Sequence, residues 1–114
     1  MYKERMHIKG IVIELMNNAL KADATDVNIS IRKLTDEVEI RVVDNGKGMT
    51  HEQNLVVKRK LEQPRRDELE DYYGALAGES MIGTGLGLVG MITDRAEVHT
   101  ALGEGTTIAV YRRM

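Results

Sequence analysis

The spacing of the apolar residues changes abruptly near residue 22, and this change limits the folds that the chain can adopt. Between residues 8 and 19 the apolar side chains recur at the spacing of one helix face, which predicts a helix over about residues 3–22. In 27–31 and again in 38–42, apolar and polar residues alternate, which predicts two half-buried strands. Only residues 33–36 separate the two strands, so we expect them to pair antiparallel.

The C-terminal part of the chain repeats this mixture of elements. A helix is predicted over 86–93, and strands are predicted over 97–101 and 107–111, joined by a glycine-containing turn at 102–105. A chain of 114 residues is most simply one domain. The sequence therefore predicts a single α/β domain over residues 1–114.

The composition excludes several classes of function. There is no cysteine, which rules out disulfides, thiolate catalysis and thiolate zinc sites, and the three histidines (His7, His51 and His99) are too scattered to predict a metal cluster. A net charge of −2 argues against a nucleic-acid partner, because such proteins usually carry a basic excess. No apolar stretch approaches the ~20 residues that cross a bilayer. We therefore expect a cytoplasmic domain with no membrane partner.

The middle of the chain, residues 45–82, is long, charged and weakly periodic. Its only proline, Pro64, divides a predicted helix over 51–63 from the residues that follow. A segment of this kind inside a compact domain is often a functional lid. The alternative is a solvated helical excursion without a role.

The first predicted helix carries Glu14, Asn18 and Lys21 on one side. Spacings of four and three residues bring them together, away from the main apolar stripe. A carboxylate, an amide oxygen and an ammonium group could orient water, a metal and phosphate. The alternative is that they form an ordinary solvated face.

A second, weaker apolar stripe repeats every seven residues on the same helix, at Met6, Ile13 and Leu20. One interpretation is that a second subunit of a homodimer, or a segment that the chain lacks, covers this stripe. The other is that these residues are partly exposed, as apolar residues on protein surfaces commonly are.

An aspartate with two following glycines ends the second predicted strand, in the sequence Val42-Val43-Asp44-Asn45-Gly46-Lys47-Gly48-Met49. Glycine allows a sharp turn and a close approach of the backbone to a ligand. The Asp44 carboxylate could accept a hydrogen bond from an exocyclic amine such as that of adenine. The alternative is an ordinary Asn-Gly turn.

Three alternating glycines open the predicted helix after the middle segment, in Gly83-Thr84-Gly85-Leu86-Gly87-Leu88. Backbone N–H groups at such a helix start can bind an anion, and this one suits a polyphosphate. Gly85, Gly87 and Gly90 match the dinucleotide pattern G-x-G-x-x-G, but no strand is predicted before them, so we reject that interpretation. The chain also has no G-K-[S/T] P-loop.

The order of these elements resembles one known plan. Residues 14–22, 44–49, 83–88 and 103–107 are similar to the N, G1 and G2 boxes and the closing G-x-G-T element of the GHKL ATPase superfamily. That superfamily includes DNA gyrase, heat-shock chaperone ATPases, histidine kinases and mismatch-repair ATPases. The resemblance implies a Bergerat-type two-layer α/β sandwich, in which helices cover one face of a mixed, mostly antiparallel sheet.

The resemblance also implies roles for individual residues in binding ATP and Mg²⁺. Asn18 would hold the Mg²⁺ ion, Glu14 would act as the general base, and Lys21 would face the phosphates. The adenine pocket would be formed by Asp44, Gly46, Gly48, Met49 and Thr106. The phosphate loop would be formed by Gly83, Gly85, Leu86, Gly87 and Leu88. The segment 50–82 would be the ATP lid.

Within the superfamily, the short link over 88–100 resembles the anti-sigma-factor serine kinases, whereas 21–29 resembles the mismatch-repair ATPases. The chain has no phenylalanine and so lacks the phenylalanine box of histidine kinases. The resemblance thus implies a histidine-kinase-like ATP-binding domain that acts on a protein partner, as a kinase or as an ATP-dependent switch. The alternatives are a binding module without phosphoryl transfer and a slow ATPase domain of a larger protein.

Overall fold

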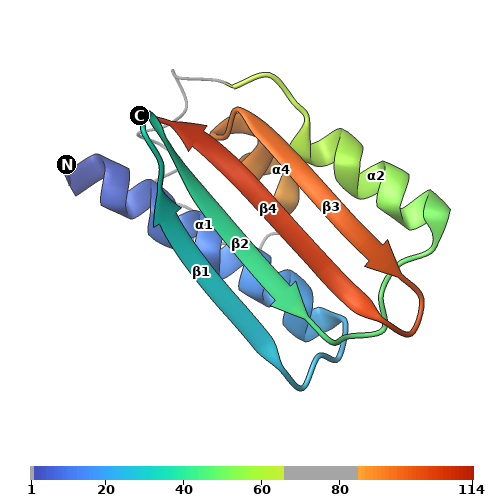
Figure 1. Ribbon diagram of the computed structural model, residues 1–114. Helices are drawn as coiled ribbons and strands as arrows, with labels where there is room; N and C mark the ends of the chain where they lie inside the picture. The colour runs from blue at the N-terminus through green and yellow to red at the C-terminus, as the bar shows by residue number, and fades with distance from the viewer. Residues whose placement is uncertain (1, 66–84) are drawn as a thin grey trace.

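A computed structural model describes residues 2–65 and 85–114 as two layers. Figure 1 shows the helices packed on one face of a sheet, whereas no described element covers the other face. The elements in chain order are α1 (Tyr2–Lys21), β1 (Val27–Lys33), β2 (Glu37–Asp44), α2 (His51–Leu61), α4 (Gly85–Met91), β3 (Arg95–Ala101) and β4 (Gly105–Arg113). The predicted α/β sandwich with helices on one face is confirmed.

The sheet has the strand order β1-β2-β4-β3, and all its pairings are antiparallel. The expected mixed sheet is therefore not found among the described strands. The chain returns through α2 and α4, so that β3 runs in the same direction as β2. However, β4 lies between these two strands and pairs with both, which removes the parallel contact.

The core lies between the sheet and the helices. It contains the apolar stripe predicted for α1, together with the helix-facing residues of the central strands. Its buried members are Ile11, Leu15, Ala19, Ile40, Val42, Leu61, Val89, Ile92, Val98, Ile108 and Val110. Burial of these aliphatic side chains is the main stabilising contribution to the domain.

Only one of the two strands predicted to be half-buried is well covered. β2 is largely buried, whereas the helix-facing Ile29 and Ile31 of β1 are 39% and 50% exposed. The prediction of a half-buried strand is therefore wrong for β1. The cause is its position at the edge of the sheet, since α1 packs mainly on β2.

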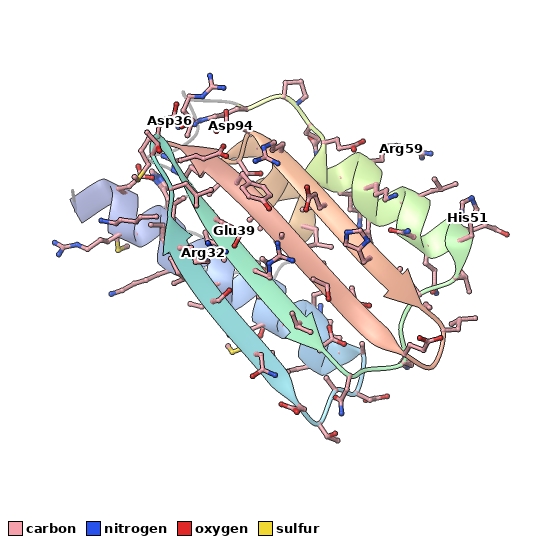
Figure 2. The ribbon with its side chains drawn as sticks, in the orientation of Figure 1. Arg32, Asp36, Glu39, His51, Arg59 and Asp94 are labelled. Atoms are coloured by element: carbon pink, nitrogen blue, oxygen red, sulfur yellow. The ribbon has the colours of Figure 1, made fainter. Side chains whose placement is uncertain are left out.

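On the face of the sheet away from the helices, polar side chains of the strands lie over the sheet itself. Glu39 is 5% exposed and accepts a hydrogen bond from the Tyr111 hydroxyl at 2.8 Å. The Arg95 guanidinium lies 3.7 Å from the centre of the Tyr111 ring. Figure 2 shows Glu39 and Arg32 on this face. Long side chains thus cover the central strands where no helix does.

Helix α2 is an integral part of the helix layer. It begins with a capping box, in which the Gln53 N–H donates to Thr50 Oγ1 at 3.1 Å and the Thr50 N–H donates to Gln53 Oε1 at 3.0 Å. Leu61 is 1% exposed and belongs to the core. Residues 50–61, which we predicted as the start of a lid, are therefore packed against the domain. Residues 66–82 of that segment lie outside the described residues.

The contact between α2 and α4 depends on Gly90. A Cβ atom at this position would lie 2.1 Å from the Lys60 carbonyl oxygen. We therefore expect Gly90→Ala to lower the free energy of unfolding by about 2–3 kcal/mol, because backbone must move to make room. Chemical denaturation checks this. In the matched variant Gly87→Ala, the added Cβ would meet, among the described residues, only the flexible Gln63 side chain at 3.4 Å, so little stability should be lost. Equal midpoints for the two variants would contradict the expected clash.

Candidate functional site

The turn after β2 fixes the carboxylate of Asp44. Asp44 is 7% exposed, and its Oδ1 accepts the N–H of Gly46 at 2.7 Å. A Cβ atom at Gly46 would lie 2.7 Å from the carbonyl oxygen of Ala22, just after α1. The Lys47 N–H donates to that same oxygen at 3.0 Å. The missing side chain of Gly46 thus lets the turn pack directly on the end of α1.

Asn45 joins this turn to the loop between α1 and β1. Its Oδ1 accepts the N–H groups of Thr25 and Asp26, both at 2.9 Å, and its Nδ2 donates to Thr25 Oγ1 at 3.0 Å. The Asn45 N–H in turn donates to the Asp26 carbonyl at 3.2 Å. Asn45 therefore stabilises the position of Asp44 from the loop side.

On its other side, the turn packs on the hairpin between β3 and β4. Gly48 has a φ of 72°, and a Cβ atom there would lie only 2.0 Å from the carbonyl oxygen of Ala101. Glycine is therefore required at this position by the backbone geometry. The Gly103 N–H closes the contact by donating to the Lys47 carbonyl at 2.8 Å.

Two threonines lie beside Asp44. Thr106 is 5% exposed and is the cross-strand partner of Asp44 on β4. Thr100 Oγ1 accepts the Met49 N–H at 3.0 Å, donates to the Gly105 carbonyl at 3.2 Å and lies 2.9 Å from Thr106 Oγ1. A hydroxyl has one proton, so Thr106 must be the donor in the threonine pair. A hollow of about 290 Å³ opens beside Asp44 and Thr106.

Glu14 is a buried carboxylate on α1 with an unsatisfied oxygen. It is 6% exposed, and its Oε2 has no hydrogen-bond partner among the described residues. Its Oε1 lies 3.4 Å from the point where a Cβ atom would stand at Gly85, the first residue of α4. Burial raises the pKa of Glu14, and the charge of Lys21 opposes this in part.

Asn18 lies between the two parts of the site described so far. Glu14 and Asn18 are spaced four residues apart on α1, and Ala22, four residues further, continues their row just past its end. Glu14 faces Gly85 at one end of the row, and Ala22 packs on Gly46 at the other. Asn18 is half-buried, and its side chain makes no hydrogen bond to the described residues. The row thus connects the start of α4 with the turn that carries Asp44.

One known protein family matches nearly the whole chain. The family model of the histidine kinase-, DNA gyrase B- and HSP90-like ATPases matches residues 3–113. The chain belongs to this ATPase family. It is accordingly an ATP-binding module of the GHKL type, as its motifs predicted. No curated protein matches the chain.

In this ATPase domain, the leucines at the start of α4 point toward the core. Leu86 and Leu88 are partly buried and pack against the buried cluster. Gln63 Nε2 lies 3.5 Å from the Gly87 carbonyl and links α2 to α4. Gly83 lies outside the described residues. The side chains of Leu86 and Leu88 thus serve packing in this structure.

The remaining predicted residues differ in their surroundings. Met49 packs against the core, whereas Lys21 is exposed. Sequence reasoning missed Asn45 and Thr100, which hold the Asp44 turn from its two sides. Asn45 had a local signal, because asparagine side chains in turns commonly bond the backbone. Thr100 had none, since its partners Met49 and Thr106 are brought to it only by the fold.

Among the described helices, none is long and apolar enough to cross a membrane.

Proposed function

We propose that this domain binds ATP with Mg²⁺ and transfers the γ-phosphoryl group to a protein partner, with water as a slower acceptor. The observation that carries the proposal is Glu14, a buried carboxylate beside the first residue of α4, one of whose oxygens has no partner among the described residues. A buried carboxylate oxygen without a partner among the described residues costs stability unless a ligand satisfies it. Perturbed acids of this kind are typical of functional sites.

Asp44 is the proposed adenine-recognition residue. One of its oxygens is held by the Gly46 N–H at 2.7 Å, so the carboxylate is oriented before the ligand arrives. The exocyclic amine of adenine is a donor that suits the carboxylate. Thr106, whose proton is directed to Thr100, presents lone pairs on the same side of the sheet. A pre-oriented acceptor loses little entropy on binding.

Asn18 is the proposed magnesium ligand, and Lys21 and the backbone of residues 85–88 are the proposed phosphate contacts. Mg²⁺ prefers oxygen ligands and is commonly bound by one or two protein groups together with substrate phosphates. The amide oxygen of Asn18 fits that role, because its side chain is not engaged elsewhere among the described residues. When bound, Mg²⁺ would neutralise charge on the phosphates and hold them in place.

Glu14 is the proposed general base. In the transfer step, an acceptor oxygen forms a bond to the γ-phosphorus while the bond from that phosphorus to the ADP oxygen breaks. The proton of the attacking hydroxyl or water passes to the Glu14 carboxylate. Its raised pKa makes the ionised carboxylate a stronger base than an exposed glutamate, which favours this transfer.

Calorimetric titration with ATP and ADP, with and without Mg²⁺, tests the binding step. We expect Mg²⁺ to increase the affinity of the wild-type domain for ATP. Asn18→Ala should lower the affinity for Mg²⁺-ATP by about 10–100-fold, the range for losing one interaction with a charged group. It should change the magnesium-free affinity little. Asn17→Ala, on the exposed side of the same helix turn, is the matched control. An equal loss with and without Mg²⁺ would contradict the assignment.

Radiolabelled ATP distinguishes the acceptors. Label that appears on a co-incubated protein identifies a kinase, and free phosphate alone identifies hydrolysis. If ATP binds but neither product forms with a broad set of partners, the transfer proposal fails. In that case, partner affinities with ADP, ATP and a non-hydrolysable analogue would show whether the domain acts as a switch without transfer.

A further inference from the structure

A row of three polar residues crosses the sheet at the end that carries the Asp44 turn. Asp44 on β2 is the cross-strand partner of Thr106 on β4, and Thr106 is in turn the partner of Thr100 on β3. Figure 1 shows β4 between β2 and β3. Directly opposite side chains on a sheet are neighbours, with their Cβ atoms about 4.5–5.5 Å apart. The Thr106 hydroxyl therefore has an oxygen-bearing neighbour on each side.

Of these two neighbours, Thr100 takes the hydroxyl proton of Thr106. The Oγ1 atoms of the two threonines lie 2.9 Å apart. Thr100 Oγ1 directs its own proton to the Gly105 carbonyl oxygen, 3.2 Å away, so it can only accept from Thr106. It also accepts the Met49 N–H at 3.0 Å. The proton and both lone pairs of the Thr100 hydroxyl are thus engaged, which fixes its orientation.

The direction of the Thr106 proton matters because a carboxylate would be the stronger acceptor for it. Asp44 instead accepts the Gly46 N–H through Oδ1 at 2.7 Å, and its Oδ2 has no hydrogen-bond partner among residues 2–65 and 85–114. The free oxygen of Asp44 and the lone pairs of Thr106 therefore lie on neighbouring strands. Together they offer a ligand hydrogen-bond acceptors and no donor.

We propose that Thr100 is a positioning residue that sets the nucleobase preference of the site, by accepting the Thr106 proton and so keeping the free oxygen of Asp44 for the ligand. This inference rests on the proposed function, in which Asp44 accepts from the exocyclic amine of adenine. Hypoxanthine carries a carbonyl oxygen where adenine carries that amine, so it would leave the acceptors unpaired. Sites built to pair with a donor reject analogues that lack it.

Thr100→Val keeps the branched shape of the side chain and removes its oxygen. The Thr106 proton then loses its acceptor on β3 and turns toward Asp44 or toward a ligand oxygen. Donation to Asp44 occupies the oxygen that adenine needs, whereas donation to the ligand gives hypoxanthine a partner that the wild-type site withholds. Both changes lower the preference for ATP over inosine triphosphate. We expect the ratio of the two affinities to fall by about tenfold, which is typical of one hydrogen bond to a charged group.

Calorimetric titration of the 114-residue chain with the Mg²⁺ complexes of ATP and inosine triphosphate measures this ratio. Thr100→Ser is the matched control, because it keeps the hydroxyl and should keep the wild-type ratio. A second comparison tests whether Thr100 acts through Thr106. Once Thr106→Val has removed the proton, adding Thr100→Val should leave the ratio unchanged. A loss caused only by loosening of the backbone at Met49 would lower the ratio on that background as well.

Circular dichroism confirms that each variant is folded before it is compared. Thr100→Cys, whose thiol is a weak acceptor, replaces the valine variant if that variant does not fold, and the same fall is expected. An unchanged ratio in Thr100→Val, or an equal fall in Thr100→Ser, would overturn the inference and leave ATP binding standing. So would a further fall on the Thr106→Val background, or a wild-type chain that binds both nucleotides equally. A wild-type chain that binds neither nucleotide would show that the proposed function itself is wrong.

Discussion

Replacing Glu14 by glutamine should slow ATP turnover by about 10²–10⁴-fold, the range typical of a lost general base. ATP affinity should stay within a few-fold of the wild-type value, because the adenine and phosphate contacts proposed above lie on other residues. Glutamine keeps the volume of the side chain and its packing against Gly85. Single-turnover measurements with saturating ATP and Mg²⁺ separate the chemical step from binding.

Glu52→Gln is the matched control, since it makes the same chemical change at an exposed glutamate on α2. It should leave turnover unchanged. If Glu14→Gln abolished ATP binding, Glu14 would be a ligand-binding group rather than a base. If it changed neither binding nor turnover, the proposed role of Glu14 in chemistry would be wrong.

Glu14→Gln has a second expected effect, which is on the stability of the domain in the absence of ATP. Burial raises the pKa of Glu14 above its ordinary value of 4.5, so losing the proton is harder in the folded than in the unfolded chain. The folded state is therefore progressively disfavoured as the pH rises from the unfolded pKa through the folded one. Glutamine has no proton to lose. Glu14→Gln should melt at a higher temperature than wild type near pH 7.5.

This difference in melting temperature should shrink as the pH falls well below 4.5, where Glu14 is protonated in both states of the wild-type chain. Thermal melts at several pH values measure it. A Glu14→Gln variant that is less stable than wild type at pH 7.5 would mean that the carboxylate is satisfied in solution. The missing partner of the Glu14 oxygen would then no longer support a functional role for Glu14.

Asp44→Ala should lower ATP affinity by about 100–1,000-fold, because a buried recognition group is lost and the adenine amine is left without its acceptor. Some stability is also lost, since the Gly46 N–H loses its partner. Asp44→Asn separates the two effects. Its amide oxygen can still accept the Gly46 N–H, but its NH₂ group would meet the donor of adenine with another donor.

Asp44→Asn should therefore be nearly as stable as wild type and still bind ATP poorly. Calorimetry with ATP and with GTP, together with thermal melts of each variant, provides the measurements. We expect the asparagine variant to lose the preference for ATP over GTP, because guanine carries an oxygen acceptor where adenine carries the amine. Unchanged ATP affinity in both variants would exclude Asp44 as the adenine contact.

The elements of this fold were largely predictable because their signals are local. The predicted first helix, 3–22, differs from α1 (Tyr2–Lys21) by one residue at each end, and the antiparallel pairing of β1 with β2 was expected from their short link. The exposure of β1 was not predictable in the same way. Alternation shows which residues of a strand share a face, but not whether another element covers that face.

Whether neighbouring strands pair parallel or antiparallel was also hard to predict from the sequence. The resemblance to the superfamily implied a mixed sheet, whereas all pairings of the described strands are antiparallel. The insertion of β4 between β2 and β3 decides this, and it depends on a contact between residues far apart in the sequence. The packing of the segment predicted as a lid was likewise not predictable, because the burial of Leu61 depends on contacts with the core and not on the charges around it.

By itself, the sequence determined the family and predicted which residues form the site. Spacing along one helix groups Glu14 with Asn18, and the Asp-x-Gly turn and the alternating glycines follow in a set order. These features could be predicted directly, because the spacing of residues along a helix, the residues of a turn and the order of motifs are all visible in the sequence. The family match over residues 3–113 agrees with that conclusion.

Only the tertiary structure decided what surrounds those residues. It buries Glu14 against Gly85 and leaves one of its oxygens without a partner among the described residues. It also shows that Gly46 and Gly48 are required by the backbones of Ala22 and Ala101, and that β1 is left exposed at an edge. The physical reason is common to all of these findings. Burial, pairing and pKa depend on atoms that distant parts of the chain supply, and only folding brings those atoms together.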